Sequence, residues 1–176
     1  MPALRAPAAL LCAALVAACA TPPVPGEAAW TSGRLNIRIA ADAERAAQST
    51  SAAFELRGDG SAGELRLVSP LGTRMAQARW APGLAALETP EGERRFASLD
   101  ELSVQAFGEA LPLAALPDWI AGRPWPGAAA EQRDDGFEQL GWRVLLARLG
   151  DGVVEASRKA PPAVVVLVRL DRDDPR

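Results

Sequence analysis

The side chains that this sequence lacks restrict its chemistry more than those it contains. Its 176 residues include no histidine and no tyrosine, so neither a Ser-His-Asp nor a Cys-His catalytic arrangement can be built. Zinc or iron sites that depend on histidine ligands are excluded for the same reason. Carboxylate or serine chemistry stays formally possible, but there is no glycine-rich phosphate loop and no nucleophile elbow. We therefore expect no enzymatic activity, no metal and no cofactor.

One side chain, Cys19, stands in a context that favours covalent modification. Residues 1–18 carry one charge, Arg5, followed by an Ala- and Leu-rich run that is too short to span a bilayer and suits a secretory signal peptide. The run ends in Leu15-Val16-Ala17-Ala18-Cys19, which resembles a bacterial lipobox. This resemblance implies a diacylglycerol on the Cys19 sulfur, cleavage before Cys19 and N-acylation of the new terminus. The alternative is an ordinary signal peptide that happens to contain a cysteine.

Processing before Cys19 would leave 158 residues, enough for one domain with a core. Cys12 leaves with the signal peptide, so no intrachain disulfide is possible. The mature chain has 18 Lys and Arg against 22 Asp and Glu, a net charge of −4, which gives no support for nucleic-acid binding. We expect a flexible lipid-anchored tether at 19–29, one domain at 30–170 and a polar tail at 171–176. By analogy with enterobacterial sorting, Ala20 instead of aspartate favours an outer-membrane location, facing the periplasm.

A second unusual feature is an apolar residue at a predicted loop tip. The segment Gly63–Trp80 alternates on both sides of Ser69-Pro70-Leu71-Gly72-Thr73, and we place Arg74 on the same face as Ala76, Ala78 and Trp80. Pro70 and Gly72 predict a turn. Leu71 either folds back onto the core or is held outward to enter a membrane or an apolar ligand.

The rest of the chain indicates short antiparallel strands around one helical segment. Further strands are expected at 34–40, 52–57, 84–88, 94–97, 137–140, 142–149, 153–157 and 163–170, while 128–136 is small and charged. Such a meander is typical of a barrel or a sandwich. The apolar run Val164–Leu167 is either buried on both faces or an exposed edge.

The helical segment has its own signals. Ser98 and Glu101 fit a capping box for a helix that Gly108 can end. Pro112 suits the first turn of a second helix over 113–122, which Pro117 should interrupt. Helices cannot pair edgewise with strands, so the segment must cover a sheet face or the mouth of an open barrel.

Four motifs in order behind the lipobox resemble the LolB family of outer-membrane lipoprotein receptors. They are Ser32-Gly33-Arg34, Leu67-Val68-Ser69-Pro70-Leu71-Gly72, Pro112-Leu113 through Leu116 to Trp119-Ile120 with Gly122 and Pro124, and Gly141-Trp142-Arg143-Val144. The resemblance implies a mainly β (α+β) fold, an open and strongly curved antiparallel β-barrel with a short helical lid around an apolar cavity. The chain departs from the family pattern in two places: Pro117 stands inside the lid helix, and the closing hairpin after Ala160 is shorter.

The implied activity is to receive acylated lipoproteins from a soluble periplasmic carrier and to release them into the outer membrane. The membrane-insertion loop of the family maps onto Pro70, Leu71 and Gly72. Candidate acyl-cavity residues, each of which could equally be ordinary core, are Phe54, Leu65, Leu67, Ala76, Ala78, Trp80, Leu116, Trp119, Ile120 and Trp142. Arg34, Arg38 and Arg66 could face an acidic carrier or simply be solvated.

Two other functions remain compatible with these residues. The protein could be an envelope lipoprotein that binds another lipid or amphiphile in the same cavity. It could also be a structural envelope lipoprotein with a filled core and no ligand cavity.

Overall fold

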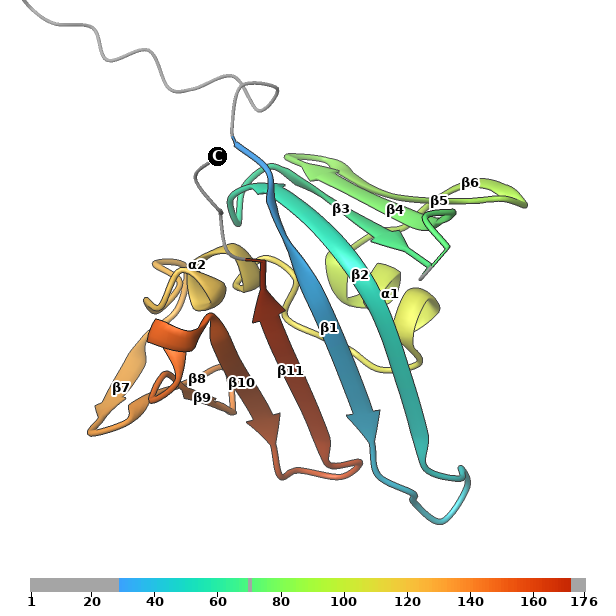
Figure 1. Ribbon diagram of the computed structural model, residues 1–176. Coiled ribbons are helices and arrows are strands. Elements are labelled where there is room, and N and C mark those ends of the chain that lie inside the picture. The colour runs from blue at the N-terminus through green and yellow to red at the C-terminus, as the bar shows by residue number, and fades with distance from the viewer. Residues whose placement is uncertain (1–28, 70, 172–176) are drawn as a thin grey trace, which may run out of the picture.

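The computed structural model describes residues 29–69 and 71–171, which form a curved antiparallel sheet with helices against its concave side (Figure 1). The strands are β1 (Thr31–Ile39), β2 (Gln48–Gly58), β3 (Gly63–Val68), β4 (Arg74–Ala81), β5 (Leu84–Thr89), β6 (Gly92–Arg95), β7 (Ala130–Arg133), β8 (Gly136–Gln139), β9 (Trp142–Leu145), β10 (Val153–Arg158) and β11 (Val164–Leu170). The helices are α1 (Leu99–Phe107), α2 (Leu116–Ile120) and the 3₁₀ helix η1 (Leu149–Asp151).

The strand order places the first and last strands in the middle of the sheet. The order is β6-β5-β4-β3-β2-β1-β11-β10-β9-β8-β7. Strands β6 and β7 are the two ends, and within the described residues they do not pair with each other. The chain between these ends is the helical segment. The expectation of an open, strongly curved antiparallel barrel with a helical lid is therefore confirmed.

Strand β11 takes a central position and not an edge. It pairs with β1 from Gly33 opposite Leu170 to Ile39 opposite Val164, and with β10 along nearly its whole length. Despite the short C-terminal segment, the closing hairpin is complete. The apolar run is therefore neither an exposed edge nor buried on both faces: Val164 is buried and Val165–Leu167 are half-buried.

The core lies on the concave side of the sheet because apolar side chains alternate along the long strands. In β1, Leu35, Ile37 and Ile39 are buried, whereas Arg34 and Arg38 between them are exposed. The same alternation continues in β2 and β3. It leaves the convex side polar and gives the helices an apolar surface to cover.

Helix α1 begins and ends where its sequence predicts. Ser98 Oγ accepts a hydrogen bond from the Glu101 N–H at 3.1 Å, and Gly108 closes the helix in the left-handed conformation with φ of 82°. The Glu101 carboxylate accepts from the N–H of Ala97 at 3.1 Å, one residue before the expected position. The buried Ser103 hydroxyl also accepts from the Leu111 N–H, which fixes the chain that follows the helix.

Helix α2 differs from the prediction at Pro117. We expected this proline to interrupt a helix that began near Pro112, but 113–115 form a turn and α2 begins at Leu116. Pro117 thus stands in the first helical turn, where its missing N–H costs no hydrogen bond. The proline starts the helix and does not break it.

Two strand predictions near the C-terminus were wrong in extent. Residues Ala130–Arg133 form β7, although no alternation of apolar residues predicts a strand there. Backbone pairing with β8 alone holds this exposed end strand. Strand β9 stops at Leu145 instead of continuing to Leu149, because the chain there turns toward η1. Gly152, with φ of 75°, ends η1.

An irregularity in β4 also corrects the predicted face of Arg74. The pairing of β3 with β4 shifts by one residue, so Val68 lies opposite Arg74 and not opposite Met75. This bulge turns Arg74 to the outer face, away from Trp80, where its Nη1 donates to Gln77 Oε1 at 2.8 Å.

The start of the folded region is fixed to the outer face of the sheet. The guanidinium groups of Arg57 and Arg66 lie 4.5 Å and 4.1 Å from the ring centroid of Trp30. Both arginines also pair with the buried Glu64 carboxylate, at 2.6 Å and 2.9 Å.

Candidate functional site

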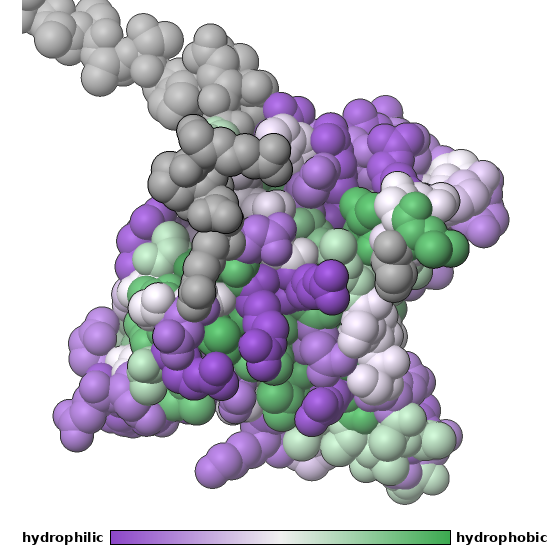
Figure 2. Space-filling model, viewed as in Figure 1, coloured by the Kyte–Doolittle hydropathy of each residue, from purple (hydrophilic) through white to green (hydrophobic). Residues whose placement is uncertain are grey.

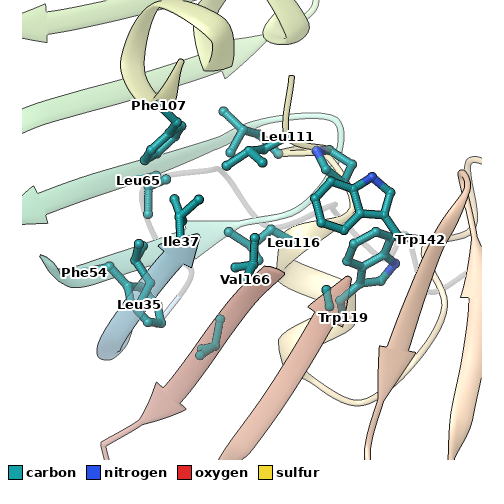
Figure 3. A pocket seen from close by; sticks show the side chains of 14 residues that line it. Leu35, Ile37, Phe54, Leu65, Phe107, Leu111, Leu116, Trp119, Trp142 and Val166 are labelled. Carbon is teal, nitrogen blue, oxygen red and sulfur yellow. The ribbon is translucent and has the colours of Figure 1, made fainter. Parts of the chain in front are cut away.

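The concave side of the sheet and the helical segment enclose a hollow whose lining is entirely apolar. In Figure 3, Trp119 and Trp142 lie side by side at one end, and Phe54, Leu35 and Leu65 lie at the other. The complete lining is Leu35, Ile37, Phe54, Leu65, Phe107, Leu111, Pro112, Leu113, Leu116, Trp119, Trp142, Ala156, Val166 and Val168. Because the lining offers no polar partner, the hollow suits a hydrocarbon and not a polar ligand.

The hollow is nearly closed in this conformation. Its volume, taken as the space open to the centres of water molecules, is about 40 Å³, and about 10–15 Å³ of such space holds one water molecule. A long acyl chain has more than ten methylene groups and could enter only if the hollow widened. The described structure is therefore a closed form of the site.

The structure brings half of the predicted cavity residues together. Five of them line the hollow, namely Phe54, Leu65, Leu116, Trp119 and Trp142. The other five pack elsewhere in or against the hydrophobic core, namely Leu67, Ala76, Ala78, Trp80 and Ile120. The Nε1–H of Trp80, for example, donates to the Asp59 carbonyl at 2.9 Å.

Several lining residues were not among the predicted ones, because they face the hollow only through the tertiary fold. Leu35 and Ile37 lie on the inward face of β1, which the sequence indicates, but β2 and β3 show the same pattern. Phe107 and Leu111 line it because α1 crosses the concave face. Only the position of the helical segment decides which inward residues border free space.

One buried glutamine fastens the helical segment to the sheet. Gln139 on β8 is 2% exposed, and its Oε1 accepts from Trp119 Nε1 at 2.8 Å and from the Trp125 N–H at 2.9 Å. Its Nε2 donates to the carbonyls of Trp125 and Ala128, both at 2.7 Å. All four hydrogen-bonding positions of the amide are thus used to hold α2 and the loop after it.

Ion pairs hold the part of the helical segment that directly follows α1. Glu109, directly after α1, pairs with Arg158 of β10 at 3.1 Å and with Arg45 of the β1–β2 loop at 3.3 Å. Arg45 also donates to the Gly108 carbonyl at 3.0 Å. Burial raises the pKa of the Glu109 carboxyl, but the hydrogen bonds and charges of Arg158 and Arg45 outweigh it and hold the pKa below its ordinary value.

The β3–β4 loop presents Leu71 to solvent with 94% of its surface exposed. Ser69 organises the loop: its Oγ accepts from the N–H groups of Leu71 and Thr73, and its carbonyl accepts from the Gly72 N–H at 2.9 Å. Gly72 supplies the φ of 82° that the turn requires. Pro70 lies outside the described residues. Hydrogen bonds to Ser69 thus hold Leu71, Gly72 and Thr73 in a turn that exposes one leucine.

The surface around this loop is hydrophobic beyond Leu71. Met75, the extra residue of the bulge, is 46% exposed next to the loop. Figure 2 shows the resulting green patch at the end of the β3–β4 hairpin, on an otherwise mostly hydrophilic face. The patch is a candidate surface for contact with another apolar surface.

Cys19 and the predicted signal peptide lie outside the described residues, as does the tail after Asp171. Within the described ranges, no helix is long and apolar enough to cross a membrane. The same part of the chain contains no group of acidic, cysteine or histidine side chains that could hold a metal ion.

Fold and site together define a lidded half-barrel with an apolar interior and an apolar loop tip. Residues 31–169 match the family described as outer membrane lipoprotein LolB, and the chain belongs to this family. It is 33% identical over 173 residues to the outer-membrane lipoprotein LolB of Bordetella pertussis, covering 89% of this chain and 86% of that protein. The LolB of Ralstonia nicotianae is 34% identical over 82% of this chain and 69% of its own.

A third relative, LolB of Bordetella petrii, is 31% identical over 96% of this chain and 91% of its own. The family is one of lipoproteins that act in lipoprotein localisation at the outer membrane, and not of enzymes. Membership of this family therefore assigns a non-enzymatic role, which the missing histidines had only indicated.

Proposed function

We propose that this protein is anchored in the outer membrane through lipid on Cys19, faces the periplasm, receives acylated lipoproteins from a soluble carrier and inserts them into the outer membrane. The observation that carries the proposal is the wholly apolar hollow under a helical segment. Family membership and the names of the relatives support it.

An apolar hollow is what acyl transfer requires. Exposing an acyl chain to water costs about 0.8 kcal/mol for each methylene group, so one long chain represents on the order of 10 kcal/mol. A receptor without nucleotide chemistry can move such cargo only downhill in free energy. It must bind acyl chains more tightly than the carrier does and less tightly than the bilayer does.

The hollow must widen before it can hold a chain, and the helical segment is the part that can move. This segment joins the two unpaired ends of the sheet, β6 and β7. Besides its apolar contacts with the core, it is held to the sheet by hydrogen bonds to Gln139 and by the ion pairs of Glu109 after α1. Displacing it exposes the hollow without breaking any strand pairing.

The exposed leucine would act at the exit step. Leu71 on its ordered loop is positioned to enter the lipid leaflet, where burying it contributes about 1.5–3 kcal/mol. This free energy is too small to anchor the protein and sufficient to lower a barrier to release. The tether, residues 19–29, can extend by up to about 35–40 Å, so the loop could touch the membrane while Cys19 stays anchored.

A direct handover assay tests the proposal. A periplasmic carrier loaded with a fluorescent acylated lipoprotein is mixed with liposomes, with and without this protein. We expect cargo to reach the liposomes only when the protein is present. Co-purification of free lipid or quinone, together with no handover of acylated protein, would instead favour an envelope lipoprotein that binds another amphiphile.

The small free volume of about 40 Å³ favours a second candidate, a structural envelope lipoprotein with a filled interior. A fluorescent fatty acid separates the two. Saturable binding, abolished by an excess of palmitate, supports the receptor, whereas no binding at any concentration supports the structural role.

A further inference from the structure

Two arginines on the outer face of the sheet lie directly opposite each other. Arg34 of β1 is the register partner of Arg169 of β11, and both side chains are exposed. Like charges opposite each other in neighbouring strands repel. Most other arginines are in ion pairs, but these two have none with the acidic side chains of residues 29–69 and 71–171. The pair is thus a concentrated positive charge without a described counter-ion.

A shallow hollow connects this pair to the β3–β4 loop. Arg34 and Arg169 line it together with Ser69 and Gly72 of the loop, and the side chain of Leu167 contributes an apolar part. The hollow follows one row across the sheet, because neighbouring register pairs lead from the end of β3 through β2 to β1 and β11. Two strand spacings, about 10 Å, therefore separate Arg34 from the end of β3.

Figure 2 shows hydrophilic side chains with hydrophobic ones between them over β1 and β11, on the same face as the hydrophobic end of the β3–β4 hairpin. A membrane phospholipid has the same spatial order of groups, with an acidic phosphate just outside an apolar layer. With the leucine in the apolar layer, Arg34 and Arg169, two and three strands away from the end of β3, would lie at the level of the headgroups.

We infer that Arg34 and Arg169 together bind the phosphate of a membrane phospholipid when Leu71 enters the leaflet, an inference that rests on the proposed function of the loop. Guanidinium groups form paired hydrogen bonds with phosphate oxygens. One phosphate between the two arginines also removes their mutual repulsion. An acidic carrier surface would be attracted to the same charges, but it would not explain why they share a hollow with the loop that carries Leu71.

The test uses the mature chain with Cys19→Ala, so that no acyl anchor hides weak binding by the domain. This chain has no other cysteine, and Thr73→Cys then carries an environment-sensitive fluorophore next to Leu71. The labelled protein is titrated with vesicles of phosphatidylcholine, which have phosphate and no net charge. It is titrated in parallel with vesicles of digalactosyldiacylglycerol, which have no phosphate. Arg38→Gln is the matched control, because Arg38 is exposed on the same face of β1 and lies outside the hollow.

We expect Arg34→Gln and Arg169→Gln each to raise the lipid concentration at half-binding about tenfold on phosphatidylcholine. Neither should change binding to the galactolipid, and Arg38→Gln should match the parent on both. Equal losses for Arg38→Gln, equal losses on the galactolipid, or no loss at all would overturn the inference. So would unchanged vesicle binding combined with slower handover from the carrier, which would assign the pair to carrier docking.

The proposed function fails in a different way from the phosphate site. If the fluorophore on the parent chain responds to neither type of vesicle, the loop does not enter membranes, and the proposed role of Leu71 is refuted together with the inference. If the parent responds to both and the arginine variants are indistinguishable from it, only the phosphate site is refuted.

Discussion

Leu71 is the clearest case of an apolar residue whose position is not explained by packing in the core. A leucine with 94% of its surface in water contributes nothing to the core, and yet the Ser69 hydroxyl and carbonyl hold its loop in a defined turn. A loop kept in order around an exposed apolar side chain is explained by a surface that this side chain contacts.

Replacement of Leu71 by glutamate should separate acceptance of cargo from its release. We expect Leu71→Glu to fold normally, since the residue makes no core contact, and to take cargo from the carrier. Release into liposomes should fall at least tenfold, because a charged side chain opposes entry into the leaflet. The handover assay measures both steps, with Ala47→Glu in the exposed β1–β2 loop as the charge control. Normal release by Leu71→Glu would refute the role of the loop.

A second residue-scale prediction concerns Gln139. Gln139→Leu leaves two donors and two acceptors of the helical segment without partners, and it should reduce the free energy of unfolding by about 2–4 kcal/mol. Denaturant unfolding measures this change. The matched control is Gln105→Leu on the exposed side of α1, which should shift stability by less than about 0.5 kcal/mol. Similar losses for both variants would show that Gln139 does not fasten the segment.

At the scale of elements, the accuracy of prediction from sequence depended on whether local or distant residues decide the structure. Helix α1 was predicted in full because Ser98, Glu101 and Gly108 specify its ends locally. Strand β7 was missed because it has no apolar periodicity and exists only through its partner β8. The face of Arg74 was wrong because nothing in the sequence announces a bulge.

The same distinction between local and distant residues explains which of the predicted cavity residues line the hollow. Alternation in β2 and β3 predicted which side chains point inward, and both Leu65 and Leu67 are buried. Only Leu65 borders the hollow, however, whereas Leu67 packs elsewhere in the core. Inward direction is a local property, whereas free space next to a side chain depends on elements far away in the chain.

The ion pairs at the end of α1 predict a pH dependence. The pKa of Glu109 is lower in the folded protein than its ordinary value, so its stabilising effect is complete above that ordinary value and is lost as the pH falls through the folded pKa. Wild type should exceed Glu109→Gln in unfolding free energy by about 1 kcal/mol at neutral pH. The difference should begin to shrink as the pH falls below the ordinary pKa of a glutamate and should vanish once the pH is below the folded pKa.

Denaturant titrations of wild type and Glu109→Gln across this pH range measure the effect, with the exposed Glu44→Gln as control. A difference between wild type and Glu109→Gln that persists in acid would contradict the assignment to the carboxylate charge. Faster uptake of a fluorescent fatty acid by Glu109→Gln would connect the ion pairs to opening of the hollow.

For the whole molecule, the open barrel implies an uneven distribution of stability. Strands β1 and β11 have a partner on both sides, whereas β6 and β7 have one each. We expect backbone amides of β1 and β11 to exchange with solvent most slowly, and those of β6, β7 and residues 108–116 at least a hundredfold faster. Hydrogen–deuterium exchange measures this directly. Protection of 108–116 equal to that of β1 would exclude opening through the helical segment.

The central position of β11 also bears on how the protein is made. The strand that joins the two halves of the sheet is synthesised last, so β1 has only one of its two neighbours until almost the whole chain has emerged. Pairing between residues near opposite ends of a chain is slow to form. We therefore expect the sheet to be completed only when almost the whole chain is available. A premature stop that removes only the final strand would leave two disconnected half-sheets for the proteases of the envelope to clear.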